Sequence, residues 1–288
     1  VGFMQVDVLI IGGGVTGCAI ARQLTRKDVS VALVEAREDV SMGASRANSA
    51  IVHAGYDAKP GSMMAKMNVL GNALYDQWCE ELEVPLKRIG SLVIAFNEAD
   101  ERELSVLYEQ GIANGVPGMQ IISGTRAREL EPVLSPDVTA ALYAPTGAIS
   151  CPYQFTVACY ENAVKNGLKA YMNTPVHSIE KTGEGFIVTC EGQTFEAKYI
   201  VNAAGIYADE IARMVGDNSF TILPRKGEYM LRDHSANCMS RVIFQTPSPR
   251  GKGVLVSPTV DDNAFAGPTA QNQDDREDVE TTDAGMAV

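Results

Sequence analysis

Three glycines near the start of the chain, Gly12, Gly14 and Gly17, have the spacing of a dinucleotide-binding turn. An apolar run over 8–11 precedes them and a helix-forming stretch follows up to Leu24, so the turn joins a strand to a helix. Gly12 permits the tight turn, Gly14 lets the backbone approach a pyrophosphate, and Gly17 lets the helix pack on the strand. The N–H groups at the start of the helix then face phosphate oxygens.

An acidic residue follows the next predicted strand, which covers 29–34. Glu35 lies eighteen residues after Gly17, the distance at which a carboxylate binds a ribose hydroxyl. The alternative is an ordinary solvated glutamate at a strand end. Because strand, glycine turn, helix and acid occur together, the sequence predicts a chain that binds a dinucleotide.

Residues 41–55 are rich in small side chains, as expected where a chain runs close to a ligand. Ser45, Asn48 and Ser49 offer short polar groups there. For Asn48 the alternative is a turn asparagine that caps its own backbone. This stretch brings His53 towards the reactive end of the bound cofactor.

Composition excludes several classes of function. The net charge of −12 and the pI of about 4.8 argue against nucleic-acid binding, which needs a basic face. The six cysteines form no C-x-x-C pair and no cluster with histidine, so we expect no metal site and reduced thiols in a cytoplasmic protein. An early strand and the lack of a long apolar run predict neither a signal peptide nor a membrane span. Peripheral attachment to a membrane stays open.

The order of elements predicts an α/β fold, in which a Rossmann-like dinucleotide-binding domain is interleaved with a mixed or antiparallel β-sheet domain. We expect the first domain at 1–84 and 146–216, the second at 85–145 and 217–270, and a solvated acidic end at 271–288. A helix is predicted over 63–82. Its apolar stripe should pack in the core, and it consists of Met63, Met67, Leu70, Leu74, Trp78 and Leu82.

The motifs, taken in order, resemble those of FAD-dependent oxidoreductases of the D-amino-acid-oxidase superfamily. They are IIGGG followed by Glu35, NSAIVHAG, KPGSMMAK, ELEVPLKRIGSLVIAF, NAAGIYAD and PRKGEYML. The most similar branch contains flavin-dependent glycerol-3-phosphate dehydrogenase and L-2-hydroxyglutarate dehydrogenase. The resemblance implies FAD as the cofactor, bound by the Rossmann-like domain. It also implies a further C-terminal segment, so we expect that the sequence is a fragment.

The resemblance assigns positions along the cofactor. It places Ala36 and Arg37 beside the adenine, and a strand backbone at Val176 in contact with it. A second glycine turn is implied at Ala204 and Gly205, where side chains would block close approach. The implied cofactor-binding residues are therefore Gly12, Gly14, Gly17, Glu35, Ala36, Arg37, Ser45, Asn48, Ser49, Val176, Ala204 and Gly205.

The implied reaction is oxidation of a secondary alcohol, with hydride transfer to the flavin. His53 is the candidate base, because an unperturbed histidine pKa near 6.5 suits proton transfer at neutral pH; the alternative is packing on the flavin. Arg225 is the candidate anchor for a small anionic substrate, since its fork pairs with two oxygens of a phosphate or carboxylate; the alternative is a solvated arginine. Lys252 is a weaker anchor. We expect structural or surface roles for His177 and His234.

Glycerol 3-phosphate is the first candidate substrate, and L-2-hydroxyglutarate or another 2-hydroxy acid is the second. An amino-acid or amine oxidase of the same fold, an inactive FAD-binding fragment and an NAD-dependent dehydrogenase are the other hypotheses. The stretch 41–55 and the turn at Gly205 favour FAD over NAD. The electron acceptor could be a quinone, oxygen or a partner flavoprotein.

Overall fold

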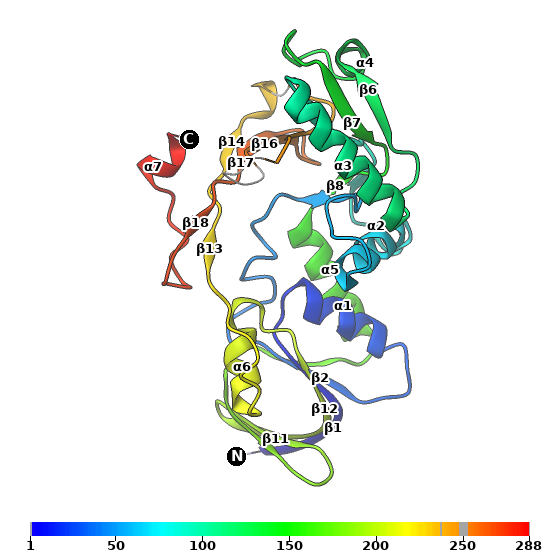
Figure 1. Ribbon diagram of the computed structural model, residues 1–288. Helices are drawn as coiled ribbons and strands as arrows, with labels where there is room; N and C mark the ends of the chain where they lie inside the picture. The colour runs from blue at the N-terminus through cyan, green and yellow to red at the C-terminus, as the bar shows by residue number, and fades with distance from the viewer. Residues whose placement is uncertain (1, 237, 248–252, 288) are drawn as a thin grey trace. The chain divides into compact units, whose positions relative to one another are not determined.

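The computed structural model describes residues 2–236, 238–247 and 253–287, and the chain forms two compact units (Figure 1). The first unit contains Val1–Asn48, Pro152–Pro224 and Gln273–Glu277. The second contains Ser49–Cys151, Arg225–Asn272 and Asp278–Val288. The chain therefore passes between the units several times, so the two domains are interleaved as expected.

The first unit is built on a six-stranded sheet in the order β10-β11-β12-β1-β2-β9. Strands β12, β1, β2 and β9 are parallel, whereas β10, β11 and β12 form an antiparallel meander. This is the predicted Rossmann-like arrangement. The strands are β1 (Gly2–Ile11), β2 (Val31–Val34), β9 (Lys169–Tyr171), β10 (Val176–Lys181), β11 (Phe186–Cys190) and β12 (Gln193–Asn202).

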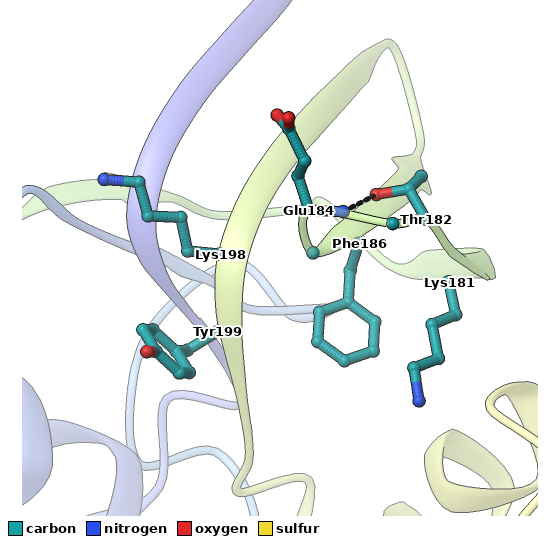
Figure 2. Close-up of a pocket in the computed structure, with 8 residues that line it drawn as sticks. Lys181, Thr182, Glu184, Phe186, Lys198 and Tyr199 are labelled. Atoms are coloured by element: carbon teal, nitrogen blue, oxygen red, sulfur yellow. Dashed lines mark hydrogen bonds between the residues drawn. The ribbon is translucent and has the colours of Figure 1, made fainter.

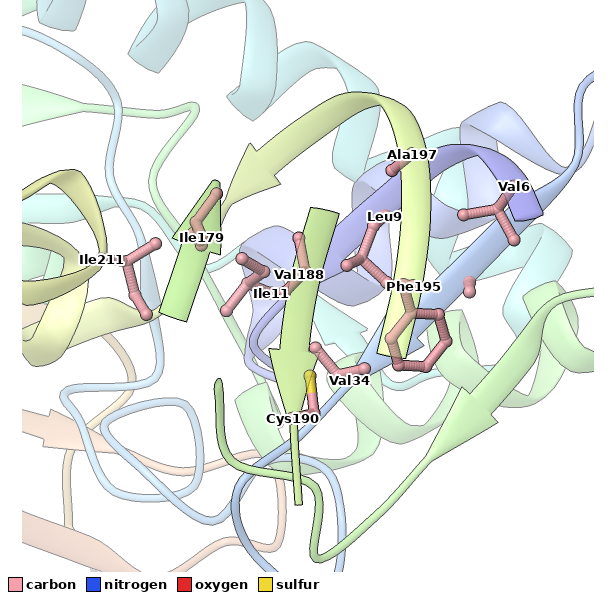
Figure 3. Close-up of a cluster of buried hydrophobic side chains, with 11 residues drawn as sticks. Val6, Leu9, Ile11, Val34, Ile179, Val188, Cys190, Phe195, Ala197 and Ile211 are labelled. Carbon is pink, nitrogen blue, oxygen red and sulfur yellow. The ribbon is translucent and has the colours of Figure 1, made fainter. Parts of the chain in front are cut away.

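Helices pack on this sheet through its apolar side chains. Helix α1 (Val15–Leu24) contacts β1, β2 and α5 (Pro152–Lys165), and Ile10 of β1 lies against it at Gly17. Helix α6 (Ala208–Met214) follows the 3₁₀ turn η1 (Gly205–Tyr207). Figure 3 shows the cluster that joins α6 to the sheet: it includes Leu9, Phe195 and Ile211. Burial of this cluster fixes the strand ends that carry the glycine turns.

The second unit contains a seven-stranded mixed sheet in the order β14-β17-β16-β15-β5-β7-β6. Successive residues of β5 (Ser91–Ala95) face opposite sides. Val93 and Ala95 pack on α3 (Glu98–Asn114), whereas Leu92 and Ile94 pack on the side of α4 (Gly124–Leu130). The other strands are β6 (Gln120–Ser123), β7 (Ala140–Ala144), β14 (Met230–Arg232), β15 (Val242–Gln245), β16 (Leu255–Pro258) and β17 (Ala264–Gly267). The predicted fold class is thereby confirmed.

Two small sheets complete the second unit. Strand β8 (Ala148–Ser150) pairs with β3 (Ile51–Val52) and β4 (Leu86–Lys87), and β13 (Arg225–Lys226) pairs with β18 (Gln271–Asn272). The pairing of β3 with β8, and the contacts of α2 (Met63–Leu82) with α3 and β4, group 49–84 with the second unit. The sequence predicts 49–84 in the first domain, and the structure groups them with the second unit instead. The remaining elements are η2 (His234–Ala236) and α7 (Asp283–Met286).

Helix α2 begins and ends as predicted, but its orientation differs from the expectation. The buried residues of the helix are Ala65, Asn72 and Cys79. The side chains of the predicted core stripe lie largely on the exposed face, and Met63, Met67, Leu70 and Leu74 are each about half or more exposed. The prediction of core packing for this stripe is therefore wrong. The backbone carbonyls of His53 and Thr146 require hydrogen-bond donors, and Asn68 and Asn72 on the polar face of α2 supply them.

Within the part of the chain that the structure describes, no helix is long and apolar enough to cross a membrane.

Candidate active site

The two predicted glycine turns follow neighbouring strands and pack against each other. Ile11 and Asn202 are register partners at the ends of the parallel strands β1 and β12, and the Ala203 N–H donates to the Ile11 carbonyl at 2.8 Å. Gly12 has a φ of +110°, and a Cβ placed on it would lie 2.3 Å from the Ala203 oxygen. Gly205 has a φ of +56°. Both turns therefore require glycine for backbone reasons.

Gly14 and Gly17 differ in what surrounds them. A Cβ on Gly17 would lie 2.0 Å from the Gly12 carbonyl oxygen, so this glycine lets α1 pack on the turn. Gly14 is the N-cap of α1. Outside its chain neighbours, the described atom that an added Cβ would meet within 4 Å is the Ser45 Oγ at 3.3 Å. The Ser45 hydroxyl accepts the Val15 N–H at 2.9 Å. Ser45 thus lies at the start of the helix, beside the open side of the turn.

The carboxylate of Glu35 is bound to the glycine turn from the next strand. Its Oε2 accepts the Gly13 N–H at 2.6 Å, and its Oε1 accepts the Arg37 N–H at 2.8 Å. A carboxylate offers about four lone-pair sites, so both oxygens keep acceptor capacity for a hydroxyl donor. Ala36, between these partners, is exposed.

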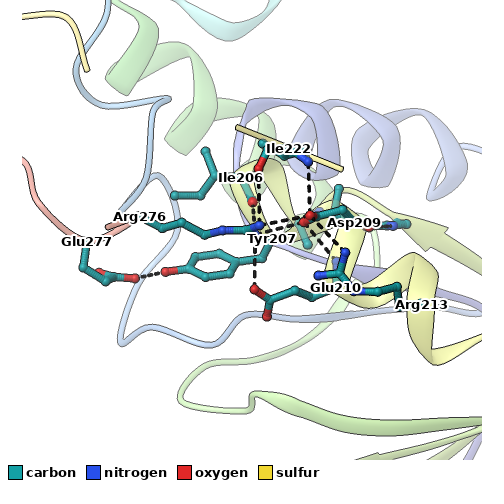
Figure 4. A network of polar contacts seen from close by, with 11 residues as sticks. Ile206, Tyr207, Asp209, Glu210, Arg213, Ile222, Arg276 and Glu277 are labelled. Carbon is teal, nitrogen blue, oxygen red and sulfur yellow. Dashed lines mark hydrogen bonds and ion pairs between the residues drawn. The ribbon is translucent and has the colours of Figure 1, made fainter. Parts of the chain in front are cut away.

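Arg37 is held by a residue from the predicted acidic end. Its guanidinium forms an ion pair with Glu277. The Tyr207 hydroxyl donates to the same carboxylate (Figure 4). The hydrogen bonds from Tyr207 and Arg37 lower the pKa of Glu277, while burial, followed by the interaction with Glu277, raises the pKa of Tyr207 to about 12. Tyr207 belongs to η1, directly after the Gly205 turn. Glu277 therefore links Arg37, which follows β2, to Tyr207, which follows β12, through one carboxylate.

The neighbouring residue Arg276 makes a two-pronged ion pair with Asp209. Its two terminal nitrogens lie 2.9 Å from the two carboxylate oxygens, and the Asp209 side chain is fully buried (Figure 4). The Ile222 N–H and Arg213 also donate to Asp209, at 3.1 and 3.2 Å. The hydrogen bonds from Arg276 are the largest cause of the lowered Asp209 pKa.

Most described residues of the predicted acidic end at 271–288 are exposed, but Arg276 and Glu277 form ion pairs with residues of the first unit. Gln273–Glu277 packs in the first unit, and the residues that follow pack in the second. Sequence reasoning also missed Arg276 and Asp209 as partners. No local signal links two residues so far apart, although an aspartate within an apolar helix pattern suggests a buried partner.

The other predicted cofactor residues have mixed environments. The Asn48 amide donates to the Ala44 and Ser45 carbonyls at 3.0 and 3.4 Å, which corresponds to the alternative of a turn-capping asparagine. Ser49 belongs to the second unit, where its hydroxyl lies 2.9 Å from the Tyr229 hydroxyl. Val176 begins β10 and is half-buried.

In the second unit, His53 lies in the loop after β3. His53 is exposed, and the centroid of its ring lies 5.8 Å from the ring centroid of Phe244 on β15. The carbonyl of His53 accepts hydrogen bonds from the amides of Asn68 and Asn72 on α2. The backbone at His53 is therefore held by two hydrogen bonds from α2.

Arg225 lies in β13, with Asn272 as its register partner, and is exposed. Among the described residues its guanidinium has no ion pair, whereas the adjacent Lys226 is nearly buried and binds Asp278 at 2.9 Å. Of the two cationic residues of β13, Arg225 is thus the one that is available to bind an anion. Lys252, the weaker candidate, lies outside the described residues.

Other polar features do not involve the predicted site residues. A hollow of about 390 Å³ at the β10–β11 hairpin is lined by Lys181, Phe186, Lys198 and Tyr199, among others (Figure 2). His177 pairs with Glu191 on the exposed side of this meander, and His234 lies in η2. Within the described ranges, no group of three or more histidine, cysteine or acidic side chains could hold a metal ion.

The sequence model of the family described as "FAD dependent oxidoreductase" matches residues 7–287. The chain belongs to this family. The predicted family is confirmed, and with it FAD as the cofactor of the family.

Known members of this FAD-dependent oxidoreductase family include similar proteins of stated activity. A glycerol 3-phosphate dehydrogenase from Caloramator mitchellensis is 48% identical over 281 residues, which are 97% of this chain and 58% of that protein. A mitochondrial L-2-hydroxyglutarate dehydrogenase from Caenorhabditis elegans is 30% identical, over 92% of this chain and 63% of its own length. The chain therefore spans about 60% of the length of these relatives.

A solved structure has the same fold. Dithionite-reduced L-α-glycerophosphate oxidase from Mycoplasma pneumoniae, with FAD bound, superposes with a TM-score of 0.91 at 33% identity. The match covers 98% of this chain and 76% of that one.

The residues of the first unit fit FAD. The open side of Gly14 is a space that a Cβ would enter, at a helix start whose N-cap provides no side-chain hydrogen bond. The second turn packs on Gly12 at Ala203 and excludes a side chain there as well. Backbone N–H groups and the positive end of α1 suit a pyrophosphate, and Glu35 is available to a ribose.

Proposed function

We propose that this chain supplies the FAD-binding turns and the reacting loop of an enzyme that oxidises glycerol 3-phosphate. The observation that carries the proposal is the 48% identity to a glycerol 3-phosphate dehydrogenase over nearly the whole chain. The glycerophosphate oxidase structure, with its TM-score of 0.91, supports the same substrate class. The lower identity, 30%, of an L-2-hydroxyglutarate dehydrogenase makes a 2-hydroxy acid the second candidate.

We propose that the first unit binds FAD through Gly12, Gly14, Gly17 and Glu35, with Ser45 and Gly205 beside it. Backbone N–H groups would hold the pyrophosphate, and the Glu35 carboxylate would accept a ribose hydroxyl. Arg37 would lie beside the adenine with its charge balanced by Glu277. When bound, FAD accepts the hydride from the substrate carbon.

The second unit would position the substrate. Arg225, exposed and without an ion pair among the described residues, would bind the phosphate through its fork of N–H donors. His53 would accept the proton of the substrate hydroxyl as the hydride leaves the same carbon, so that the alcohol becomes a ketone. Free cysteines throughout the chain suit our assignment of this reaction to the cytoplasm.

Anaerobic reduction of the flavin tests the reaction class. The protein, saturated with FAD, is mixed separately with glycerol 3-phosphate, L-2-hydroxyglutarate and a neutral amino acid. We expect glycerol 3-phosphate to bleach the flavin absorbance fastest. Bleaching by the amino acid alone, or failure to take up FAD, would overturn the proposal, and faster bleaching by hydroxyglutarate would move it to the second candidate.

His53→Gln tests the assignment of the base. We expect the rate of flavin reduction to fall by about 10²- to 10⁴-fold, the usual contribution of general base catalysis. His177→Gln is the matched control, because His177 is an exposed residue paired with Glu191. An unchanged rate in His53→Gln would show that this histidine is not the base.

A further inference from the structure

The loop that carries His53 is held by side-chain amides from α2. Strand β3 ends at Val52, and His53 is the first residue after it. The Nδ2 of Asn68 donates to this carbonyl at 2.8 Å, and the Nδ2 of Asn72 donates to it at 3.0 Å. Two donors therefore use both lone pairs of one oxygen. We call these two amides the amide clamp.

The orientation of the Asn72 amide follows from its partners. Its nitrogen faces the carbonyls of His53 and Thr146, which are acceptors, and its Oδ1 accepts from Arg88 at 2.9 Å. A flipped amide would place oxygen against two carbonyls and nitrogen against a guanidinium. Only one orientation satisfies every group, so Asn72 is fixed as a donor to His53.

Arg88 is itself fixed by a complete set of acceptors. Its Nε and one terminal nitrogen bind the two Asp76 oxygens at 3.0 and 2.7 Å. The remaining N–H groups bind Asn72 and the Thr146 carbonyl, so every donor of the guanidinium has a partner. These hydrogen bonds hold the pKa of Asp76 below its usual range. The ion pair of Arg88 with Asp76 thereby holds Asn72 in place through the hydrogen bond from Arg88.

The spacing on α2 explains how one helix does this. Asn68, Asn72 and Asp76 follow one another every four residues, so they lie on one face, a turn apart. The same loop approaches the helix closely at Gly55, whose φ is +111° and whose added Cβ would lie 2.8 Å from Val69. The polar face of α2 is thus turned towards the His53 loop.

We infer that Asn68 and Asn72 are positioning residues for His53, acting through its backbone carbonyl. The inference rests on the proposed role of His53 as the base. With its carbonyl fixed, the Cα–Cβ bond of His53 keeps one direction, and the imidazole samples fewer positions. Small displacements of a reacting group slow catalysis strongly. The proposed anchor of the substrate anion, Arg225, belongs to another segment, β13, so substrate binding should change little.

The test uses the full chain loaded with FAD and the substitution Asn68→Leu, which removes the donor at similar volume. Asn68 is half-buried, so folding tolerates the change better than at the buried Asn72. We expect a fall in kcat of about 10- to 100-fold with KM within about twofold. Asn68→Gln, which keeps an amide donor, should recover part of the rate. Asn166→Leu is the control, because that exposed amide donates within its own helix end.

Two further measurements separate positioning from general loss of structure. The chain has three histidines, so the imidazole NMR signal of His53 can be assigned by its absence in His53→Gln. Asn68→Leu should shift or broaden that signal and leave those of His177 and His234 unchanged. The double variant Asn68→Leu/His53→Gln should be no slower than His53→Gln, because the clamp acts only through His53.

The outcomes distinguish the two hypotheses. If His53→Gln retains its rate, the proposed role of His53 fails. If His53→Gln is slow but Asn68→Leu reacts at the normal rate, with an unchanged His53 signal, the amide clamp is refuted. Additive losses in the double variant would also refute it, since they would mean that Asn68 acts independently of His53.

Discussion

The glycine turns of the first unit and the His53 loop of the second are fixed by different parts of the chain. At Gly12 and Gly17 the contacts are between backbone atoms, and an added Cβ would lie 2.0 to 2.3 Å from a carbonyl oxygen. At His53 the contacts come from amide side chains of α2, at 2.8 and 3.0 Å from one carbonyl. The first region leaves no room for a side chain at these two glycines, and the second depends on side chains.

This difference matches the proposed tasks. A pyrophosphate is bound by backbone N–H groups and a helix end. Every residue type except proline supplies such an N–H, so close approach is what matters. A base must point in one direction, and in the His53 loop the amides of Asn68 and Asn72 hold the backbone. We therefore expect the glycine turns to be disrupted by added side-chain atoms, and the His53 loop to be disrupted by the loss of the amide donors.

The largest effect is expected for Gly12→Ala. The new methyl group meets the Ala203 carbonyl, and alanine is strained at a φ of +110°. We expect loss of bound FAD and a large fall in the midpoint of thermal unfolding. Gly43→Ala is the matched control, because no described heavy atom lies within 4 Å of its added Cβ. Retention of FAD by Gly12→Ala would contradict the packing of the two turns.

The sequence allowed prediction of the first region because its requirements are local. A short strand, three glycines and an acid at fixed spacing are sufficient to place Gly12, Gly14 and Glu35 around one turn. The mixed-sheet domain also followed from the order of elements. Such patterns need no knowledge of distant contacts.

The orientation of α2 could not be predicted in this way. Its apolar residues do recur at helical spacing, but the structure exposes Met63 and Met67 and buries Asn72. The amide is buried because the His53 and Thr146 carbonyls need donors, and those partners are 19 and 74 residues away in the sequence. The pairing of Arg276 with Asp209, 67 residues apart, was hidden for the same reason.

The next largest effect is expected when the ion pair of Arg276 with Asp209 is removed. This change tests whether side-chain contacts also stabilise the first unit. Arg276→Met leaves the buried Asp209 carboxylate with fewer partners, so we expect the midpoint of thermal unfolding at pH 7 to fall by several degrees. Arg26→Met, at an exposed position of the same unit, should change it little.

The pH dependence follows from the lowered pKa of Asp209. A carboxylate with a depressed pKa in the folded state stabilises it above the unfolded value of about 3.9, and this contribution is lost as the pH falls further. The difference between the wild-type chain and Arg276→Met should therefore be constant from pH 7 to about pH 5 and shrink below about pH 4. A difference that grows on acidification would have the wrong sign.

The smallest effect is expected for Ser45→Ala. The Ser45 hydroxyl accepts the Val15 N–H at the start of α1, and loss of such a cap costs about 1 kcal/mol in the free energy of unfolding. Ser105→Ala, which removes an exposed hydroxyl bonded within α3, is the control and should cost less. Denaturant unfolding measures both, and absorbance measures the FAD that remains bound. Because backbone groups hold the pyrophosphate in our proposal, Ser45→Ala should keep its FAD. Complete loss of FAD from this variant would mean that side chains hold the cofactor too, and the contrast between the two regions would disappear.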